Sequence, residues 1–145
     1  MVIGGLVPPK NGNVTLDSQN PLKMKDKIGV YIEDSEVYGH LSVNDILTFT
    51  KKIKGNISEV FELPQGSRRF SSLSTGNRKK VMLTFALSGH PKALVLDEPF
   101  ANLDEKAVLS LREFISKFEG AVILTTQEDE KICSAQYDVD KWTVK

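Results

Sequence analysis

The sequence predicts an α/β fold with a parallel β-sheet, and three observations support this prediction. First, three apolar runs have the length of strands: Ile28–Ile32, Ala93–Leu96 and Ala121–Thr126. The run Ala93–Leu96 is unbroken and reads as a strand buried on both faces. Second, segments with helical periodicity separate these runs, which is typical of parallel strands joined by helices. Third, 145 residues are enough to bury one core but are too few for two.

The composition excludes several classes of protein. Nineteen basic and nineteen acidic residues give no net charge, so the whole chain has no electrostatic attraction to nucleic acid or to an anionic membrane. The apolar runs are far shorter than the ~20 residues of a membrane helix. A single cysteine, Cys133, rules out an internal disulfide framework and suits a reducing compartment. We therefore expect a cytosolic chain with one domain, to which a subdomain is attached.

The first half of the chain predicts helices around the first strand. A short β-prone run, Val14–Leu16, follows a cluster of turn residues. Ser42 and Asp45 have the spacing of a capping box, with aspartate in place of the usual glutamate or glutamine. They begin a predicted helix that ends near Gly55. Ile57–Leu63 predicts a second, shorter helix.

Helical periodicity returns in Arg78–Leu87, where four apolar residues share one face: Val81, Met82, Phe85 and Ala86. The preceding turn, Ser74-Thr75-Gly76, is then the amino end of this helix. Unpaired backbone N–H groups, the positive end of the helix dipole and a hydroxyl group suit an anion such as phosphate. An ordinary helix N-cap explains the same residues without any ligand.

Two adjacent carboxylates, Asp97 and Glu98, directly follow the apolar run Ala93–Leu96. Parallel sheets bind ligands at the carboxyl ends of their strands, which is where these side chains lie. Asp97 suits a magnesium-bound water, and Glu98 suits a general base that polarises an attacking water. The two side chains point to opposite faces if the strand continues through them. By itself, an apolar run followed by two acids also arises by chance.

The segment Ala101–Asp104 leads into a third helix, with Asp104 as its N-cap. The expected buried positions of this helix are Val108, Leu111, Ile115 and Phe118. The strand Ala121–Thr126 comes next and has Gln127 at its end. A final strand is predicted within Val139–Thr143.

Three of these motifs, in this order and spacing, resemble those of the ATP-binding-cassette family. LSTGN at Leu73–Asn77 is similar to its signature LSGGQ, ALVLDEP at Ala93–Pro99 to its Walker B strand, and ANLD to its D-loop. The resemblance implies a P-loop NTPase-like, three-layer αβα core, here incomplete, with a small helical subdomain. It assigns residues 1–33 and 91–145 to the ATPase core and residues 34–90 to the helical subdomain that carries the signature.

The resemblance also implies an ATP and magnesium site shared between two subunits. Four signature residues would contact an ATP held mainly by a partner subunit: Ser74, Thr75, Gly76 and Asn77. Thr75 and Asn77 depart mildly from the common Gly and Gln of the family. Glu98 would be the general base, Asp97 the magnesium-water ligand, and Asp104 a bridge between the subunits.

Two further positions depart from the family pattern. Glu33 stands where the Q-loop has glutamine, so it still offers an oxygen to magnesium but adds a negative charge and loses the amide donors. A solvated loop acid is the alternative interpretation of Glu33. Gln127 stands at the switch histidine; it can donate a hydrogen bond to a terminal phosphate, but it cannot carry a proton.

The sequence contains no phosphate loop of the form G-x-x-x-x-G-K-[ST], although Ile3–Val14 resembles the segment that follows this loop in the family. We therefore expect a family member that lacks its first part and binds ATP poorly alone. The implied function is the ATP-binding subunit of an ABC transporter, peripheral to the inner face of the cell membrane. Its implied partners are a second ATP-binding subunit and a transmembrane subunit.

Two alternatives remain. A regulatory or interaction module that keeps the fold without hydrolysing ATP is favoured by the missing phosphate loop and by Glu33 and Gln127. A DNA-linked ATPase head is disfavoured, because the interval from Glu33 to Leu73 is too short for the long coiled coil of such proteins. The absence of net charge also gives no reason to expect a nucleic-acid partner.

Overall fold

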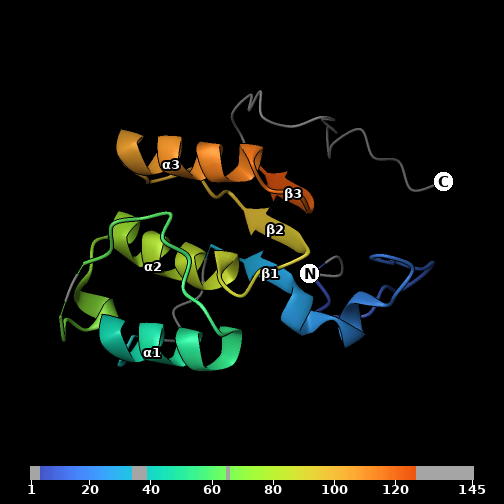
Figure 1. Ribbon diagram of the computed structural model, residues 1–145, viewed down its shortest axis with the longest axis horizontal. Helices are drawn as coiled ribbons and strands as arrows, with labels where there is room; N and C mark the ends of the chain where they lie inside the picture. The colour runs from blue at the N-terminus through green and yellow to red at the C-terminus, as the bar shows by residue number, and fades with distance from the viewer. Residues whose placement is uncertain (1–3, 34–38, 65, 127–145) are drawn as a thin grey trace.

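A three-stranded parallel sheet is the centre of the computed structural model, which describes residues 4–33, 39–64 and 66–126. The strands β1 (Ile28–Tyr31), β2 (Ala93–Asp97) and β3 (Ala121–Thr125) lie side by side in this order (Figure 1). The register pairs Tyr31 with Leu96 and Asp97 with Thr125. Their carboxyl ends therefore share one edge of the sheet, and the predicted α/β class and parallel strands are confirmed.

Three α-helices accompany the sheet in the described part of the chain: α1 (Val43–Lys54), α2 (Thr75–Leu87) and α3 (Glu105–Ser116). Three-residue 3₁₀ helices lie at η1 (Pro21–Lys23), η2 (Lys25–Lys27) and η4 (Phe70–Ser72). Figure 1 shows α1 alongside α2, while α3 lies on the other side of α2 from α1 and adjoins β3. None of the helices formed by described residues is both long enough and apolar enough to cross a membrane.

The capping box that the sequence predicts for α1 is present. The Ser42 hydroxyl oxygen accepts from the Asp45 backbone N–H at 3.1 Å, and the Asp45 carboxylate accepts from the Ser42 N–H at 3.0 Å. The helix ends at Gly55, which has a φ of 85° that glycine adopts without a steric penalty. These contacts are local, which is why the sequence predicts where this helix begins and ends. The Val43 N–H also donates to the Arg68 carbonyl oxygen at 3.1 Å, so a distant contact adds to the local ones at the amino end.

The main core lies between one face of the sheet and the helices α2 and α3. Leu94 and Leu96 of β2 are fully buried there, together with Leu83 of α2 and Leu111 of α3. Close packing requires glycine at position 29 of β1, because a Cβ atom there would lie 2.2 Å from the Ala86 carbonyl oxygen. Helix α2 thus packs directly against the backbone of β1.

Strand β3 is less covered than its neighbours. The exposed fraction of Ile123 is 43%, whereas that of Val95, its partner in β2, is 7%. Among the described residues β3 pairs only with β2, so its outer edge carries no described strand. The final strand predicted within Val139–Thr143 lies outside the described residues, as does Gln127.

A second, smaller cluster joins α1, η4 and α2. Its buried members are Val43, Ile46, Phe70, Leu73 and Val81. Helix α2 therefore packs into both clusters, through Val81 on one side and through Leu83 and Ala86 on the other. The division into an ATPase core and a helical subdomain at residues 34–90 remains a prediction.

The prediction of a helix at Ile57–Leu63 is wrong. Its described residues are not helical; Phe61 is buried in the main core, and the Ser58 N–H donates to the Ser88 hydroxyl oxygen at 2.9 Å. A helix of seven residues is marginal in water, so contacts with distant residues decide the conformation. The predicted strand Val14–Leu16 is also absent, because Leu16 forms only an isolated bridge with Gln19.

The predicted apolar face of α2 was incomplete. Val81 and Ala86 are buried as expected, but Met82 and Phe85 are only partly buried. Leu83, Thr84 and Leu87 are buried instead, on another side of the helix. A single apolar stripe is typical of a surface helix, whereas α2 is packed between two clusters and buries residues around most of its circumference.

Candidate functional site

Thr125 joins the two acidic residues at the carboxyl end of β2. Its hydroxyl group donates to the Asp97 carboxylate at 2.5 Å. The Glu98 backbone N–H donates to both the carbonyl and the hydroxyl oxygen of Thr125, each at 3.1 Å. Thr125 is not among the site residues predicted from the sequence, although a threonine that ends the strand next to β2 was a signal for it.

The backbone of Glu98 adopts a left-handed conformation with a φ of 46°. This conformation costs a non-glycine residue about 1–2 kcal/mol, so other contacts must hold it. Thr125 holds the N–H group, and the Lys79 ammonium group donates to the carbonyl oxygen at 2.8 Å. Strand β2 therefore ends at Asp97, and strand alternation does not determine where the Glu98 side chain points.

Glu33 follows β1 and is paired with a lysine of α2. Its carboxylate accepts from the Lys79 ammonium group at 3.0 Å, and 38% of the Glu33 side chain is exposed. Lys79 itself is almost completely buried. Lys79 is not among the site residues predicted from the sequence, although its position four residues before Leu83 places it on a buried side of the helix.

The amino end of α2 forms the signature turn. Ser74 is the N-cap, and its hydroxyl oxygen accepts weakly from the Asn77 backbone N–H at 3.4 Å. Ser74 and Thr75 are exposed, while Gly76 and Asn77 are partly buried. Ser74 therefore caps the amino end of a thirteen-residue helix, and the first residue of this helix, Thr75, is exposed.

The signature turn lies against the segment Ala101–Asp104. A Cβ atom at Gly76 would lie 2.7 Å from the Asn102 carbonyl oxygen, so only glycine fits there without movement. Asp104 is the N-cap of α3, as predicted, and accepts from the Ala107 backbone N–H at 2.9 Å. Lys80 forms an ion pair with Asp104, and this hydrogen bond, together with that from Ala107, lowers the pKa of the Asp104 carboxyl group.

Consecutive lysines of α2 therefore connect the signature helix to both of the following motifs. Lys79 contacts Glu98 after β2, and Lys80 contacts Asp104 before α3. The structure brings the three motifs of the sequence together through this one helix. Gln127 lies outside the described residues, and no contact of that side chain is described.

The donor atoms at the carboxyl edge suit magnesium with a phosphate ligand. Within the described residues, no three His, Cys, Asp or Glu side chains gather closely enough to hold a metal ion. Magnesium in ATP sites is commonly bound by one or two carboxylates together with substrate phosphates, so such a cluster is not required. Asp97, oriented by Thr125, fits that pattern; Glu33 shares its carboxylate with Lys79.

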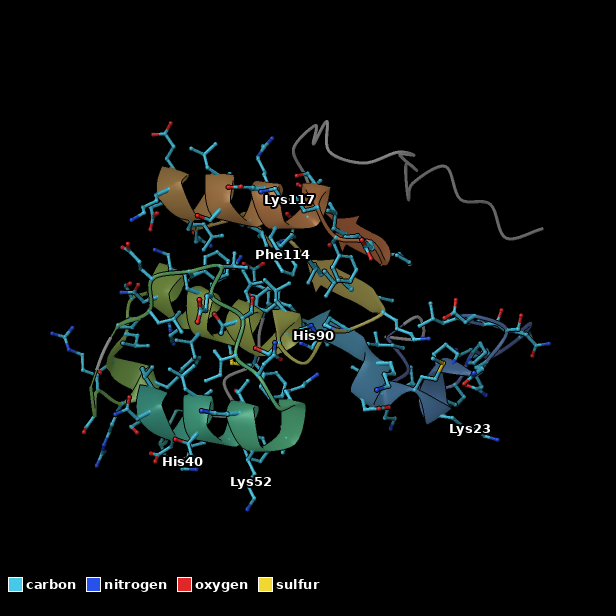
Figure 2. The ribbon with its side chains drawn as sticks, viewed as in Figure 1. Lys23, His40, Lys52, His90, Phe114 and Lys117 are labelled. Carbon is cyan, nitrogen blue, oxygen red and sulfur yellow. The ribbon has the colours of Figure 1, made fainter. Side chains whose placement is uncertain are left out.

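A hollow of about 630 Å³ lies at the other end of the sheet. Figure 2 labels three of its lining residues, His90, Phe114 and Lys117. His90 precedes β2 and Gly120 precedes β3, so the hollow lies beside the amino ends of these strands. Among the described residues, none of the site residues predicted from the sequence lines this hollow. The candidate site is therefore at the carboxyl ends of the strands.

Comparison with known proteins matched residues 1–101 to the sequence family described as "ABC transporter". A relative from Chlorella vulgaris, named a probable sulfate/thiosulfate import ATP-binding protein, is 32% identical over 140 residues. A relative from Synechococcus elongatus, also named a sulfate/thiosulfate import ATP-binding protein, is 33% identical over 140 residues. Each alignment covers 86% of this chain, but the chain spans only 59% and 41% of the two relatives.

A solved structure with a similar fold comes from Pyrococcus furiosus, where it is described as an ABC transporter ATP-binding protein. It superposes with a TM-score of 0.80 at 24% sequence identity. The superposition covers 98% of this chain and 77% of the other. At this identity the likeness establishes the fold, and it confirms the α/β architecture predicted from the sequence.

Proposed function

Because the chain belongs to the ABC transporter family, we propose that it supplies the signature and Walker B part of an ATP-binding subunit that couples ATP hydrolysis to solute transport. The observation that carries this proposal is the pair Asp97 and Glu98 at the carboxyl end of a buried parallel strand, tied to the signature helix through Lys79. The import named for the two curated relatives favours import as the direction of transport.

The proposed roles follow from the contacts at this edge. Glu98 accepts a proton from the attacking water, and Asp97 holds a water bound to magnesium. Thr125 orients Asp97 by a hydrogen bond and restrains the backbone of Glu98. When bound, magnesium supplies positive charge that offsets the charge of the transferring phosphoryl group. Glu33 remains a second candidate magnesium ligand, in competition with its ion pair to Lys79.

The signature turn is proposed to bind ATP held mainly by a second ATP-binding subunit. Four residues form this surface: Ser74, Thr75, Gly76 and Asn77. The exposed amino end of α2 supports this role, because backbone N–H groups and the helix dipole favour phosphate. Asp104, which forms an ion pair with Lys80 of the same helix α2, is proposed to bridge the two subunits. Gln127 is proposed as the degenerate switch residue.

A transmembrane subunit is the other proposed partner. Helix α1 exposes two large apolar side chains, Phe49 and Ile53, each about half exposed. Exposed apolar residues on one helix favour a contact with another protein. Through this partner the chain would lie at the cytoplasmic face of a membrane.

The alternative is a module that keeps the fold without hydrolysing ATP. The specific observation in its favour is that Glu33, which stands at the glutamine position of the Q-loop, is ion-paired with Lys79 at 3.0 Å. This pairing competes with the binding of magnesium by the same carboxylate. Measured ATP hydrolysis separates the two functions.

The test of the proposed function fuses the phosphate-loop segment of the Chlorella vulgaris relative to the amino end of this chain; we call the product the extended chain. We expect the extended chain to bind ATP with magnesium at micromolar concentrations and to hydrolyse it, as measured by calorimetry and phosphate release. The chain alone should bind much more weakly, because the signature gives few contacts to phosphate. A folded extended chain that neither binds nor hydrolyses millimolar ATP would favour the non-hydrolysing module.

Thr125 offers a second test, because its hydroxyl group orients Asp97. We expect Thr125→Val in the extended chain to lower magnesium-dependent ATP turnover about 10-fold or more, the usual scale for losing a group that orients a metal ligand. Thr125→Ser keeps the hydroxyl group and is the matched control, with turnover close to that of the parent. Equal turnover in the valine and serine variants would show that the hydroxyl group plays no such role.

A further inference from the structure

Lys79 is a buried cation to which the proposed roles assign no purpose. Only 3% of the residue is exposed. Lysine is rarely buried unless its ammonium group is paired, because the charge loses its hydration. The groups that surround this ammonium ion therefore determine why it is there.

Within the described part of the chain, the ammonium nitrogen of Lys79 makes contacts with Glu33, Glu98 and Tyr31. It lies 3.0 Å from a Glu33 carboxylate oxygen, 2.8 Å from the Glu98 carbonyl oxygen and 5.6 Å from the centre of the Tyr31 ring. Hydrogen bonds from a charged donor are stronger than neutral ones, and the ring face adds a favourable cation–π contact. The buried charge is thus held by contacts from two different strand ends.

These contacts link three elements that are distant in sequence. Glu33 follows β1, Glu98 follows β2, and Lys79 belongs to α2, whose amino end is the signature turn. The two hydrogen bonds span 46 and 19 residues of the chain. One side chain therefore connects the ends of two adjacent strands to the signature helix.

The contact with Glu98 restrains the proposed general base. Its left-handed backbone is held at the N–H group by Thr125 and at the carbonyl group by Lys79. Loss of Lys79 would remove the hydrogen bond at the Glu98 carbonyl oxygen and weaken the restraint on the peptide that carries the base. Because a misplacement of about 1 Å can cost much of a catalytic rate, this restraint bears on catalysis.

The contact with Glu33 controls charge at the same edge. The Glu33 side chain is partly exposed, and its strand β1 pairs in parallel with β2, which ends at Asp97. Without Lys79, Glu33 would add an uncompensated negative charge where ATP, itself an anion, is proposed to bind. The ammonium group offsets that charge from within the protein.

We infer that Lys79 is a positioning residue that fixes the Glu98 peptide and neutralises Glu33, so that the signature helix and the proposed catalytic carboxylate move as one unit. This inference rests on the proposed function. It predicts that substitutions of Lys79 and Glu33 have non-additive effects on the free energy of unfolding. It also predicts that substitution of Lys79 changes the environment of the Glu98 carbonyl group.

The first measurement is a double-mutant cycle in the chain itself, with Lys79→Met, Glu33→Gln and both together, followed by urea unfolding. We expect the effect of Lys79→Met on the unfolding equilibrium constant to differ about fivefold or more between the parent chain and the Glu33→Gln variant. The matched cycle uses Lys106→Met and Glu62→Gln, an exposed pair at 2.8 Å, with an expected coupling of about twofold or less. If Lys79→Met does not fold, Lys79→Gln replaces it in the cycle.

The second measurement is the carbonyl ¹³C resonance of Glu98 in the NMR spectrum, which reports the hydrogen bond at that oxygen. We expect Lys79→Met to shift it and Lys106→Met to leave it in place. The inference would be overturned if the coupling between Lys79 and Glu33 were no larger than that between Lys106 and Glu62. It would also be overturned if the Glu98 resonance did not shift in Lys79→Met.

The third measurement is the turnover of the extended chain. Lys79→Met should lower kcat about tenfold or more, because the change moves the base, and should raise the KM for ATP, because Glu33 is left without its neutralising cation. Adding Glu33→Gln to Lys79→Met should restore the KM for ATP but not the kcat. An unchanged kcat would refute the positioning role. If the extended chain with Lys79 intact hydrolyses no ATP, the proposed function fails instead, and the first two measurements still decide the inference.

Discussion

Glu98→Gln is expected to lower the kcat of ATP hydrolysis by the extended chain about 10²-fold or more, the scale of removing a positioned general base. Glutamine keeps the size and the hydrogen-bonding capacity of the side chain but cannot accept the proton of the attacking water. The backbone contacts of residue 98 with Thr125 and Lys79 do not involve the side chain, so the local structure should be retained. ATP affinity should therefore change little.

Single-turnover hydrolysis and ATP titration by calorimetry measure the two quantities separately. Glu119→Gln is the matched control, because Glu119 is an exposed residue beside the hollow at the opposite end of the sheet. It should leave turnover as in the parent. Unchanged turnover in Glu98→Gln would mean that another group accepts the proton, and Glu98 would then have only a structural role.

Leu94→Ala is expected to destabilise the fold by about 2–5 kcal/mol, the range observed when a buried leucine is truncated. Leu94 is fully buried at the centre of β2 and packs beside the close contact between Gly29 and α2. The neighbouring backbone cannot collapse easily into the cavity, because α2 already touches the Gly29 position. A substantial fraction of the total stability of a domain this size would be lost.

Urea unfolding at a constant m-value gives this loss directly. Ile123→Ala on the adjacent strand is the matched control, because the side chain is 43% exposed and should cost less than about 1 kcal/mol. Equal costs at the two positions would show that β2 is not the centre of the core. They would also contradict the placement of the Asp97 and Glu98 pair at the end of a rigid strand.

Local patterns in the sequence predicted most of the elements. The apolar runs of β1, β2 and β3 were identified to within about one residue. For β1 and β2 the reason is that buried strands of a parallel sheet need nearly continuous apolar sequence; β3 has such a sequence but is partly exposed. The Ser42–Asp45 capping box and the Asp104 cap were also predicted correctly. Each depends on residues no more than three apart, so the information lies within the segment itself.

The same local patterns failed where distant contacts decided the outcome. The segment Ile57–Leu63 has apolar residues suited to a short helix, but Phe61 is buried in the core. Helix α2 buries Leu83 and Thr84 because it is enclosed by two clusters, which its own periodicity cannot reveal. Burial on several sides depends on which elements pack around a helix.

For the candidate site, the sequence by itself determined the order of the motifs to which we assign the chemistry: the signature turn, the pair Asp97 and Glu98, and Asp104. Only the tertiary structure decided how they are held. Thr125 reaches Asp97 across 28 residues of chain, and Lys79 reaches Glu33 across 46. A hydrogen bond needs its two atoms within about 3 Å, and only the parallel pairing of the strands and the packing of α2 bring such distant residues that close.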